Sequence, residues 1–223
     1  MQLSLPFKLN AKMLWQDFVG DKNQQIIKFL SDLFNQSDSA ITYIYGEKST
    51  GKTHLLQGCA FEALDKSLSV MYLDFSEKMP PGILDDLENH DWVCIDNVEL
   101  LNDKEQQALF DLYNRSLNSS VKLLISGNNL PNQLNLLKDL ETRLSLSTVF
   151  ALEVLSDQQK KQIIQQQMTN KNLTLEHKII DYLLKYYSRD LSDLLDAVNQ
   201  LDRASLQQKS AITIPLVKQV LAI

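Results

Sequence analysis

The stretch ITYIYGEKSTGKTHLLQ, residues 41–57, decides the fold of this 223-residue chain. Its first five residues are β-branched or aromatic, which is typical of a strand buried in a sheet. Gly46 and Gly51 then bound a short loop, and a mostly apolar helical stretch begins at Lys52. The pattern Gly-x-x-x-x-Gly-Lys-Thr between a strand and a helix predicts a phosphate-binding loop.

Each residue type of this loop has a physical task. Glycines allow backbone conformations that let N–H groups point at phosphate oxygens, and the helix N-terminus adds positive potential. Lys52 is expected to reach the β- and γ-phosphates, and Thr53 to offer its hydroxyl to Mg²⁺. His54 is expected to pack beside them. The other predicted nucleotide contacts of the loop are Gly46, Glu47, Lys48, Ser49, Thr50 and Gly51, and Asp96 and Asn97 are predicted contacts further along the chain.

Further apolar runs rich in β-forming residues predict a sheet around this loop. They cover residues 69–75, 92–96, 121–126 and 148–153, with helices expected at 52–66 and 104–117. Short apolar strands that alternate with helices favour an α/β domain, in which both faces of a parallel sheet are covered.

After Leu155 no strand pattern is evident in the sequence. Ser156 and Gln159 form a predicted capping box, and Pro215 suits the first turn of a last helix. Helices are expected at 157–169, 175–187, 190–206 and 214–222. We therefore expect a small all-helical domain behind the α/β domain.

Composition excludes several classes of protein. The net charge of −6 argues against broad binding to DNA or to an anionic membrane. Cys59 and Cys94 lie in apolar runs without metal-binding spacing, which predicts reduced, buried thiols. No signal peptide or membrane-spanning run is recognisable, so a cytoplasmic location is expected. Arginine is rare, and its positions are Arg115, Arg143, Arg189 and Arg203.

The run WVCIDNVE, residues 92–99, supplies the second predicted metal contact. Asp96 follows a buried strand and is expected to hold Mg²⁺ through water. The next position usually carries an acid that polarises the attacking water in ATPases, but here it is Asn97, whose amide cannot accept a proton. Glu99 is an alternative acid two residues further on. Nucleotide binding with slow hydrolysis is the resulting expectation.

Several motifs together resemble the AAA+ proteins of the DnaA group, over nearly the whole chain. They are FVGDKN (18–23), the loop at 46–53, CIDN (94–97), FDLYNR (110–115), QLNLLKDLETRL (133–144), LDRAS (201–205) and TIPLVK (213–218). The resemblance implies a three-layer AAA+ domain with a five-stranded parallel sheet at 14–155 and a helical lid at 156–223. It also places Phe18 and Val19 in an adenine pocket, and it implies that a DnaA-type DNA-binding domain is missing from this sequence.

The same resemblance implies roles for single residues. Asn128 corresponds to sensor 1, with Ser126 as the second choice. Arg143 resembles an arginine finger that acts in the nucleotide site of a neighbouring protein, and the alternative is a surface ion pair with Glu141 or Asp139.

The lid departs from the pattern of the group. Ser192 stands where a sensor-2 arginine is usual, and Arg189 lies almost one helical turn earlier. Contact between the lid and the nucleotide is therefore an open question.

The N-terminal segment resembles a peptide that docks on the polymerase sliding clamp, and residues 1–13 are expected to be this peptide and its linker. Such an extended peptide fills a preformed apolar pocket with a few anchors. The alternative is a strand packed on its own domain. The predicted contacts are Gln2, Leu3, Leu5, Pro6 and Phe7.

Three hypotheses of function follow. In the leading one, the protein carries ADP or ATP with Mg²⁺, docks on the clamp and stimulates ATP hydrolysis by DnaA, so that replication initiation is inhibited. DNA would be reached only through the loaded clamp, and self-association stays open. The alternatives are an autonomous P-loop ATPase or kinase, and a DnaA-like adaptor that recruits a partner without stimulating hydrolysis.

Overall fold

The computed structural model describes residues 9, 13–18, 21–171 and 175–223. Within them the chain divides into two compact units between Val154 and Leu155. The predicted clamp-docking residues 2–7, and Val19 of the predicted adenine pocket, lie outside the described residues.

The first unit is built on a parallel sheet, which confirms the predicted fold class. Among the described residues the sheet has five strands in the order β2-β3-β4-β1-β5. Their bounds are β1 Ala40–Tyr45, β2 Val70–Asp74, β3 Trp92–Asp96, β4 Lys122–Gly127 and β5 Thr148–Ala151. Strands β3 and β4 are buried along their whole length because helices cover both faces.

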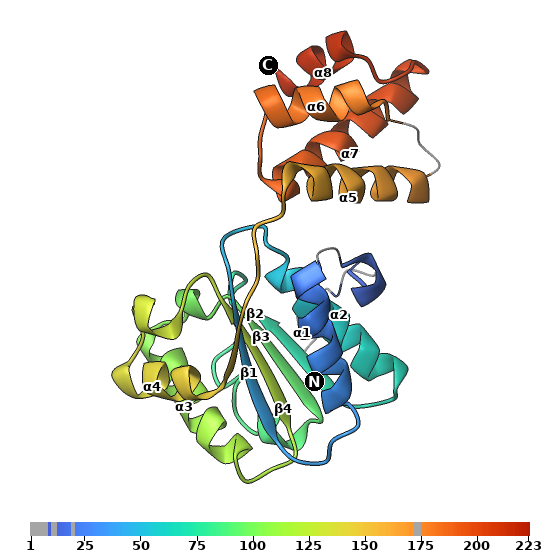
Figure 1. Ribbon diagram of the computed structural model, residues 1–223. Coiled ribbons are helices and arrows are strands. Elements are labelled where there is room, and N and C mark those ends of the chain that lie inside the picture. The colour runs from blue at the N-terminus through green and yellow to red at the C-terminus, as the bar shows by residue number, and fades with distance from the viewer. Residues whose placement is uncertain (1–8, 10–12, 19–20, 172–174) are drawn as a thin grey trace. The chain divides into compact units, whose positions relative to one another are not determined.

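Helices form the two outer layers of this unit (Figure 1). One face of the sheet carries α1 (Asp21–Leu33) and α2 (Lys52–Asp65), and the other carries α3 (Asp103–Ser116) and α4 (Lys138–Leu146). Each face has an apolar core of its own. Short 3-10 helices connect the elements: η1 Trp15–Asp17, η2 Leu87–Asn89, η3 Val98–Leu100 and η4 Pro131–Gln133.

The second unit contains helices alone within its described residues. They are α5 Asp157–Asn170, α6 His177–Tyr186, α7 Leu191–Gln208 and α8 Ile214–Leu221. Ser156 and Gln159 form the predicted capping box, and Pro215 lies in the first turn of α8. Apolar side chains from all four helices make one core.

Two further outcomes concern the whole described chain. Cys59 and Cys94 are free and buried, as predicted. In the parts of the chain that the structure describes, no helix is long and apolar enough to cross a membrane.

Candidate nucleotide-binding site

The loop between β1 and α2 is tied together by its own groups. The Lys52 ammonium donates to the backbone carbonyls of Gly46, at 2.7 Å, and Glu47, at 3.0 Å. Thr50 Oγ1 donates to the carbonyl of Glu47 at 2.9 Å. Ser49 and Gly51 adopt φ values of 61° and 101°, so the backbone turns through the left-handed region twice. A glycine-bearing loop that leads into a helix N-terminus is the backbone arrangement that phosphate-binding loops use.

Both motif glycines are required by close approaches. A Cβ on Gly46 would lie 2.8 Å from Thr50 Oγ1 and 3.0 Å from the carbonyl oxygen of Leu152. A Cβ on Gly51 would lie 2.7 Å from Cε2 of Phe18, in a conformation that is strained for any other residue. Phe18 therefore lies directly against the loop, which is where an adenine-pocket residue is expected.

Residues 14–18 are fastened to α2 by three contacts. Trp15 Nε1 donates to the carbonyl of Leu55 at 3.0 Å. His54 Nε2 lies 2.8 Å from the carbonyl of Leu14, and the His54 ring meets Phe18 edge-on at 5.4 Å. His54 thus packs beside the loop, and its contacts explain how Phe18 is held there.

Asp96 and Thr53, the two predicted Mg²⁺ ligands, lie together. Asp96 ends β3, is 0% exposed, and accepts hydrogen bonds from the hydroxyls of Ser126, Tyr72 and Thr53. Burial raises the pKa of this carboxyl, while the hydrogen bonds from Ser126 and Thr53 oppose the rise. A carboxylate beside a threonine hydroxyl at the start of α2 is a donor set that fits a hard divalent cation. The hydroxyl of Ser126, the second choice for sensor 1, is therefore used in the hydrogen bond to Asp96.

The side chain of Asn97 has other partners than the side chain of Asp96. It adopts the left-handed region, with φ 62°, and its side-chain amide donates to Asp74 Oδ1 at 2.7 Å. Its backbone N–H donates to Ser126 Oγ at 3.3 Å. The amide of Asn97 is therefore turned towards the end of β2.

Glu99 and the loop after β4 form the next part of the site. Asn128, the predicted sensor 1, is exposed, and its backbone N–H donates to Glu99 Oε2 at 3.3 Å. Burial lowers the pKa of Lys52, and the charges of Glu99 and Asp96 oppose that shift. Glu99 thus acts on the ammonium of the phosphate-binding loop as well as on the sensor loop.

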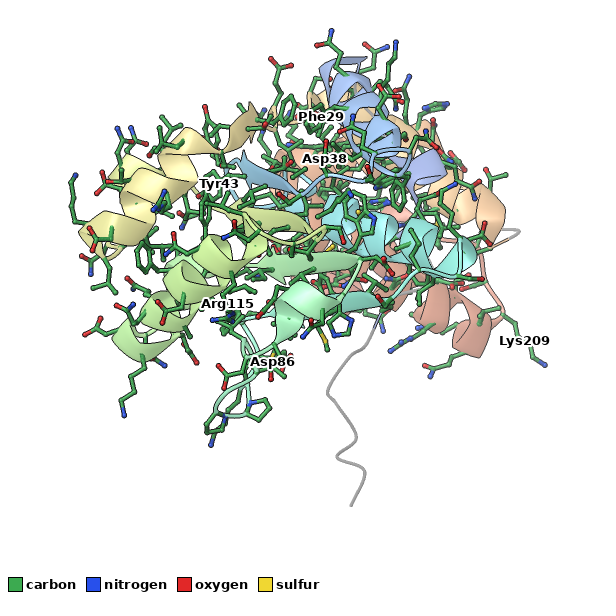
Figure 2. The ribbon with its side chains drawn as sticks, turned by 90° about the horizontal axis from the view of Figure 1, so that it is seen from below. Phe29, Asp38, Tyr43, Asp86, Arg115 and Lys209 are labelled. Atoms are coloured by element: carbon green, nitrogen blue, oxygen red, sulfur yellow. The ribbon has the colours of Figure 1, made fainter. Side chains whose placement is uncertain are left out.

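A tyrosine from β1 anchors the sensor loop. Tyr43 Oη donates to the carbonyl of Asn129 at 2.7 Å, and Figure 2 labels Tyr43 among the side chains of the first unit. Burial, with a smaller contribution from Glu99, raises the Tyr43 pKa far above its usual range, so the hydroxyl stays a donor. A Cβ on Gly127 would lie 2.1 Å from Tyr43 Oη, so only glycine fits beneath it.

Arg143 lies on α4, outside this cluster. The alternative of an ion pair with Glu141 is not found, because Glu141 pairs with Lys138 at 2.8 Å. Among the described residues, Arg143 has no ion pair with Asp139 either. Its guanidinium instead lies 5.9 Å from the ring centroid of the buried Tyr113, a cation–π contact.

The other described arginines are placed differently. Arg115 on α3 donates to Glu88 at 2.8 Å and to the carbonyl of Leu84, which ties it to the loop that bears Asp86 (Figure 2). In the lid, Arg189 is exposed and lies 3.9 Å from Asp157, and Ser192 is exposed in the first turn of α7.

The comparisons with known proteins identify the family. Residues 9–151 match the family model of the bacterial DnaA ATPase domain. The chain belongs to this DnaA family. Residues 157–221 match the model of the lid domain of Hda, so this DnaA-family chain combines a DnaA-type ATPase domain with an Hda-type lid.

Solved structures share the fold of this DnaA-family chain. Domain III of Thermotoga maritima DnaA has a TM-score of 0.81 at 21% identity, covering 97% of this chain and 98% of that one. AMPPCP-bound DnaA from Aquifex aeolicus scores 0.73 at 21% identity, with 91% and 71% covered. The RuvB Holliday junction branch migration motor of Thermotoga maritima scores 0.70 at 16% identity, with 96% and 73% covered.

Sequence reasoning missed several residues of this DnaA-family site. Tyr72 and Tyr43 lie inside strands, where an aromatic residue is usual, so nothing in the sequence distinguishes them. Asp74 had a recognisable signal, since it is an acid next to the last residue of the predicted strand 69–75, and it pairs with Asp96 in the sheet. Trp15 precedes the recognised FVGDKN segment and carried no signal of its own.

Proposed function

We propose that this DnaA-family protein is a negative regulator of replication initiation that stimulates ATP hydrolysis by DnaA in trans. It binds ADP or ATP, docks on the polymerase sliding clamp through residues 2–7, and presents Arg143 to the nucleotide held by DnaA. The combination of a DnaA-type ATPase domain with an Hda-type lid supports the assignment to DnaA-related regulation.

Nucleotide binding is supported by the loop geometry and by a structural neighbour, the DnaA of Aquifex aeolicus with bound AMPPCP. Residues 46–53 would hold the phosphates, and Phe18 and Val19 would contact the adenine base. Thr53 and Asp96 would hold Mg²⁺, which would neutralise negative charge that develops on the phosphates during hydrolysis. Lys52→Ala should abolish the thermal stabilisation by ADP, which is about 2.7 kcal/mol at a ligand concentration of 100 Kd.

The observation that carries the proposal is the set of contacts that the Arg143 side chain makes. It is half-buried on α4 and rests on the Tyr113 ring, while the neighbouring acid Glu141 is engaged by Lys138. Its charge is therefore not neutralised by either acid named as its alternative partner. An arginine supplied in trans stabilises charge on the transferred phosphoryl group and is worth orders of magnitude in rate.

The test is a DnaA-ATP hydrolysis assay with DNA-loaded clamp. Arg143→Ala should abolish stimulation and leave binding of ADP to this protein unchanged. Arg203→Ala, at an exposed arginine on α7, is the matched control and should stimulate normally. Full stimulation by Arg143→Ala would refute the finger and favour the adaptor alternative.

Clamp docking is tested separately. Replacing Leu5 and Phe7 by alanine should abolish clamp binding in a calorimetric titration, while ADP binding stays normal. An unchanged clamp affinity would refute this part of the proposal.

The roles of the sensor positions belong to the same proposal. Asn128 would contact the γ-phosphate or the water. In the lid, Arg189 or Ser192 would supply the sensor-2 contact, and Arg189→Ala should weaken ADP binding if the arginine takes that role.

A further inference from the structure

The chain turns sharply after β3, and the turn redirects Glu99, the acid that follows Asp96 in the sequence. Asn97 adopts the left-handed region and starts η3, so Glu99 returns to the carboxyl end of the sheet. Meanwhile the side chain of Asn97 donates to Asp74 and is not available to orient a water elsewhere. Position 97, where an acid is usual, therefore carries an amide that is already hydrogen-bonded to Asp74.

Glu99 occupies the space that this turn creates. Its carboxylate accepts the backbone N–H of Asn128 in the sensor loop. Its charge also acts on the Lys52 ammonium and on the Tyr43 hydroxyl, so Glu99 lies near the phosphate-binding loop and β1 as well as the sensor loop. The side chain is only half-buried, which leaves it accessible to water.

Two neighbouring acids, Asp96 and Asp74, are less suited to activating water. Asp96 is fully buried and accepts hydrogen bonds from three hydroxyl groups. Asp74 belongs to β2, which β3 and β4 separate from β1 and the loop that follows it. Its Oδ1 accepts from Asn97 and from the N–H of Ser76, at 2.7 and 2.9 Å.

We propose that Glu99 is the acid that activates water for hydrolysis of the ATP bound to this chain itself, in place of the acid missing at position 97. The Glu99 carboxylate accepts a proton from water as the water oxygen bonds to the γ-phosphorus. The bond between the γ-phosphorus and the bridging oxygen breaks, ADP leaves, and the proton passes from Glu99 to the inorganic phosphate. The activity in cis goes beyond the proposed action on DnaA, and would let the protein convert its own ATP state to its ADP state.

Glu99→Gln tests this assignment because glutamine keeps the acceptor for Asn128 and removes the charge. Hydrolysis of radiolabelled ATP under single-turnover conditions should fall about 100-fold, the scale of general base catalysis. Glu77→Gln, at an exposed acid after β2, is the matched control and should hydrolyse ATP normally.

Nucleotide affinity supplies a second readout that does not depend on turnover. Removing a negative charge that acts on Lys52 should tighten binding of ATP more than binding of ADP, measured by calorimetry. Unchanged hydrolysis in Glu99→Gln would overturn the assignment. An equal loss of ATP and ADP affinity would also overturn it, since that result indicates a structural role.

Hydrolysis of the chain's own ATP can be tested separately from the stimulation of DnaA. Glu99→Gln should still stimulate DnaA fully when it carries ADP, because stimulation in that state needs no hydrolysis of ATP on this chain. Each proposal can therefore fail while the other stands.

Discussion

Gly58→Ala tests how the segment around Trp15 is held on α2. Gly58 is a buried position inside the helix, and a Cβ there would lie 2.3 Å from Cδ1 and 2.8 Å from Nε1 of Trp15. No side-chain rotation at residue 58 can relieve this contact, because the Cβ position is set by the backbone. The Trp15 ring must therefore move.

Two opposing effects set the magnitude. Alanine favours a helix over glycine by about 0.5–1 kcal/mol. Against this, forcing an extra methyl into a packed site costs about 1–3 kcal/mol. Displacing Trp15 also breaks its 3.0 Å hydrogen bond to Leu55, worth about 1 kcal/mol. The net expectation is a loss of about 1–3 kcal/mol in the free energy of unfolding of the first unit.

The assay is urea unfolding followed by tryptophan fluorescence, measured in four proteins. Both tryptophans, Trp15 and Trp92, belong to the first unit, so the signal reports that unit. In a Trp15→Ala background the clash is gone, and Gly58→Ala should then stabilise the unit by about 0.5–1 kcal/mol. A stabilising effect of Gly58→Ala in the presence of Trp15 would refute the reasoning.

Three further predictions concern other parts of the chain. Ser156→Ala removes the cap of α5 and should cost the lid about 1 kcal/mol in thermal or urea unfolding. Two hydrogen bonds from Ser69 lower the pKa of Asp91, so the folded state gains stability above the ordinary aspartate pKa of about 3.9 and loses it as the pH falls through the lower folded value. Asp91→Asn should therefore flatten the acid limb of the urea midpoint plotted against pH, and an unchanged limb would contradict this. Tyr113→Leu removes the ring beneath Arg143 and should reduce, without abolishing, stimulation of DnaA hydrolysis, whereas Tyr113→Phe keeps the ring and should stimulate normally.

The strands were predictable because their apolar, β-branched runs are short and separated by helices. The residues at which the strands end were less predictable. The fifth strand was expected to continue to residue 153, but it ends at Ala151 because its partner β1 ends at Tyr45, the residue paired with Ala151. The bounds of a strand depend on its neighbour in the sheet, which the local sequence does not contain.

Two helices of the first unit were not predicted. Helix α4 begins after Leu137, which provides no side-chain cap, so the usual start signal is missing. Helix α1 is rich in polar residues, although Ile26, Leu30 and Leu33 recur at helical spacing and are buried. That spacing was the signal that could have found it.

The placement of Lys52, Thr53 and Asp96 was predictable because each belongs to a motif, while their roles toward a nucleotide stay predictions. Placement was not predictable where side chains from separate strands converge. The engagement of Asn97 by Asp74 depends on the pairing of β2 with β3 and on a left-handed turn at a residue other than glycine. Neither property is visible in the local sequence.

The contact between Tyr43 and Gly127 constrains how this family can change over generations. A side chain at 127 cannot coexist with the tyrosine at 43, since its Cβ would meet the hydroxyl oxygen. A relative that replaces Gly127 should therefore carry a residue smaller than tyrosine at the position of Tyr43, and the two substitutions should occur together. The pair is a prediction of covariation between β1, the strand before the phosphate-binding loop, and the last residue of β4, and an alignment of relatives can test it.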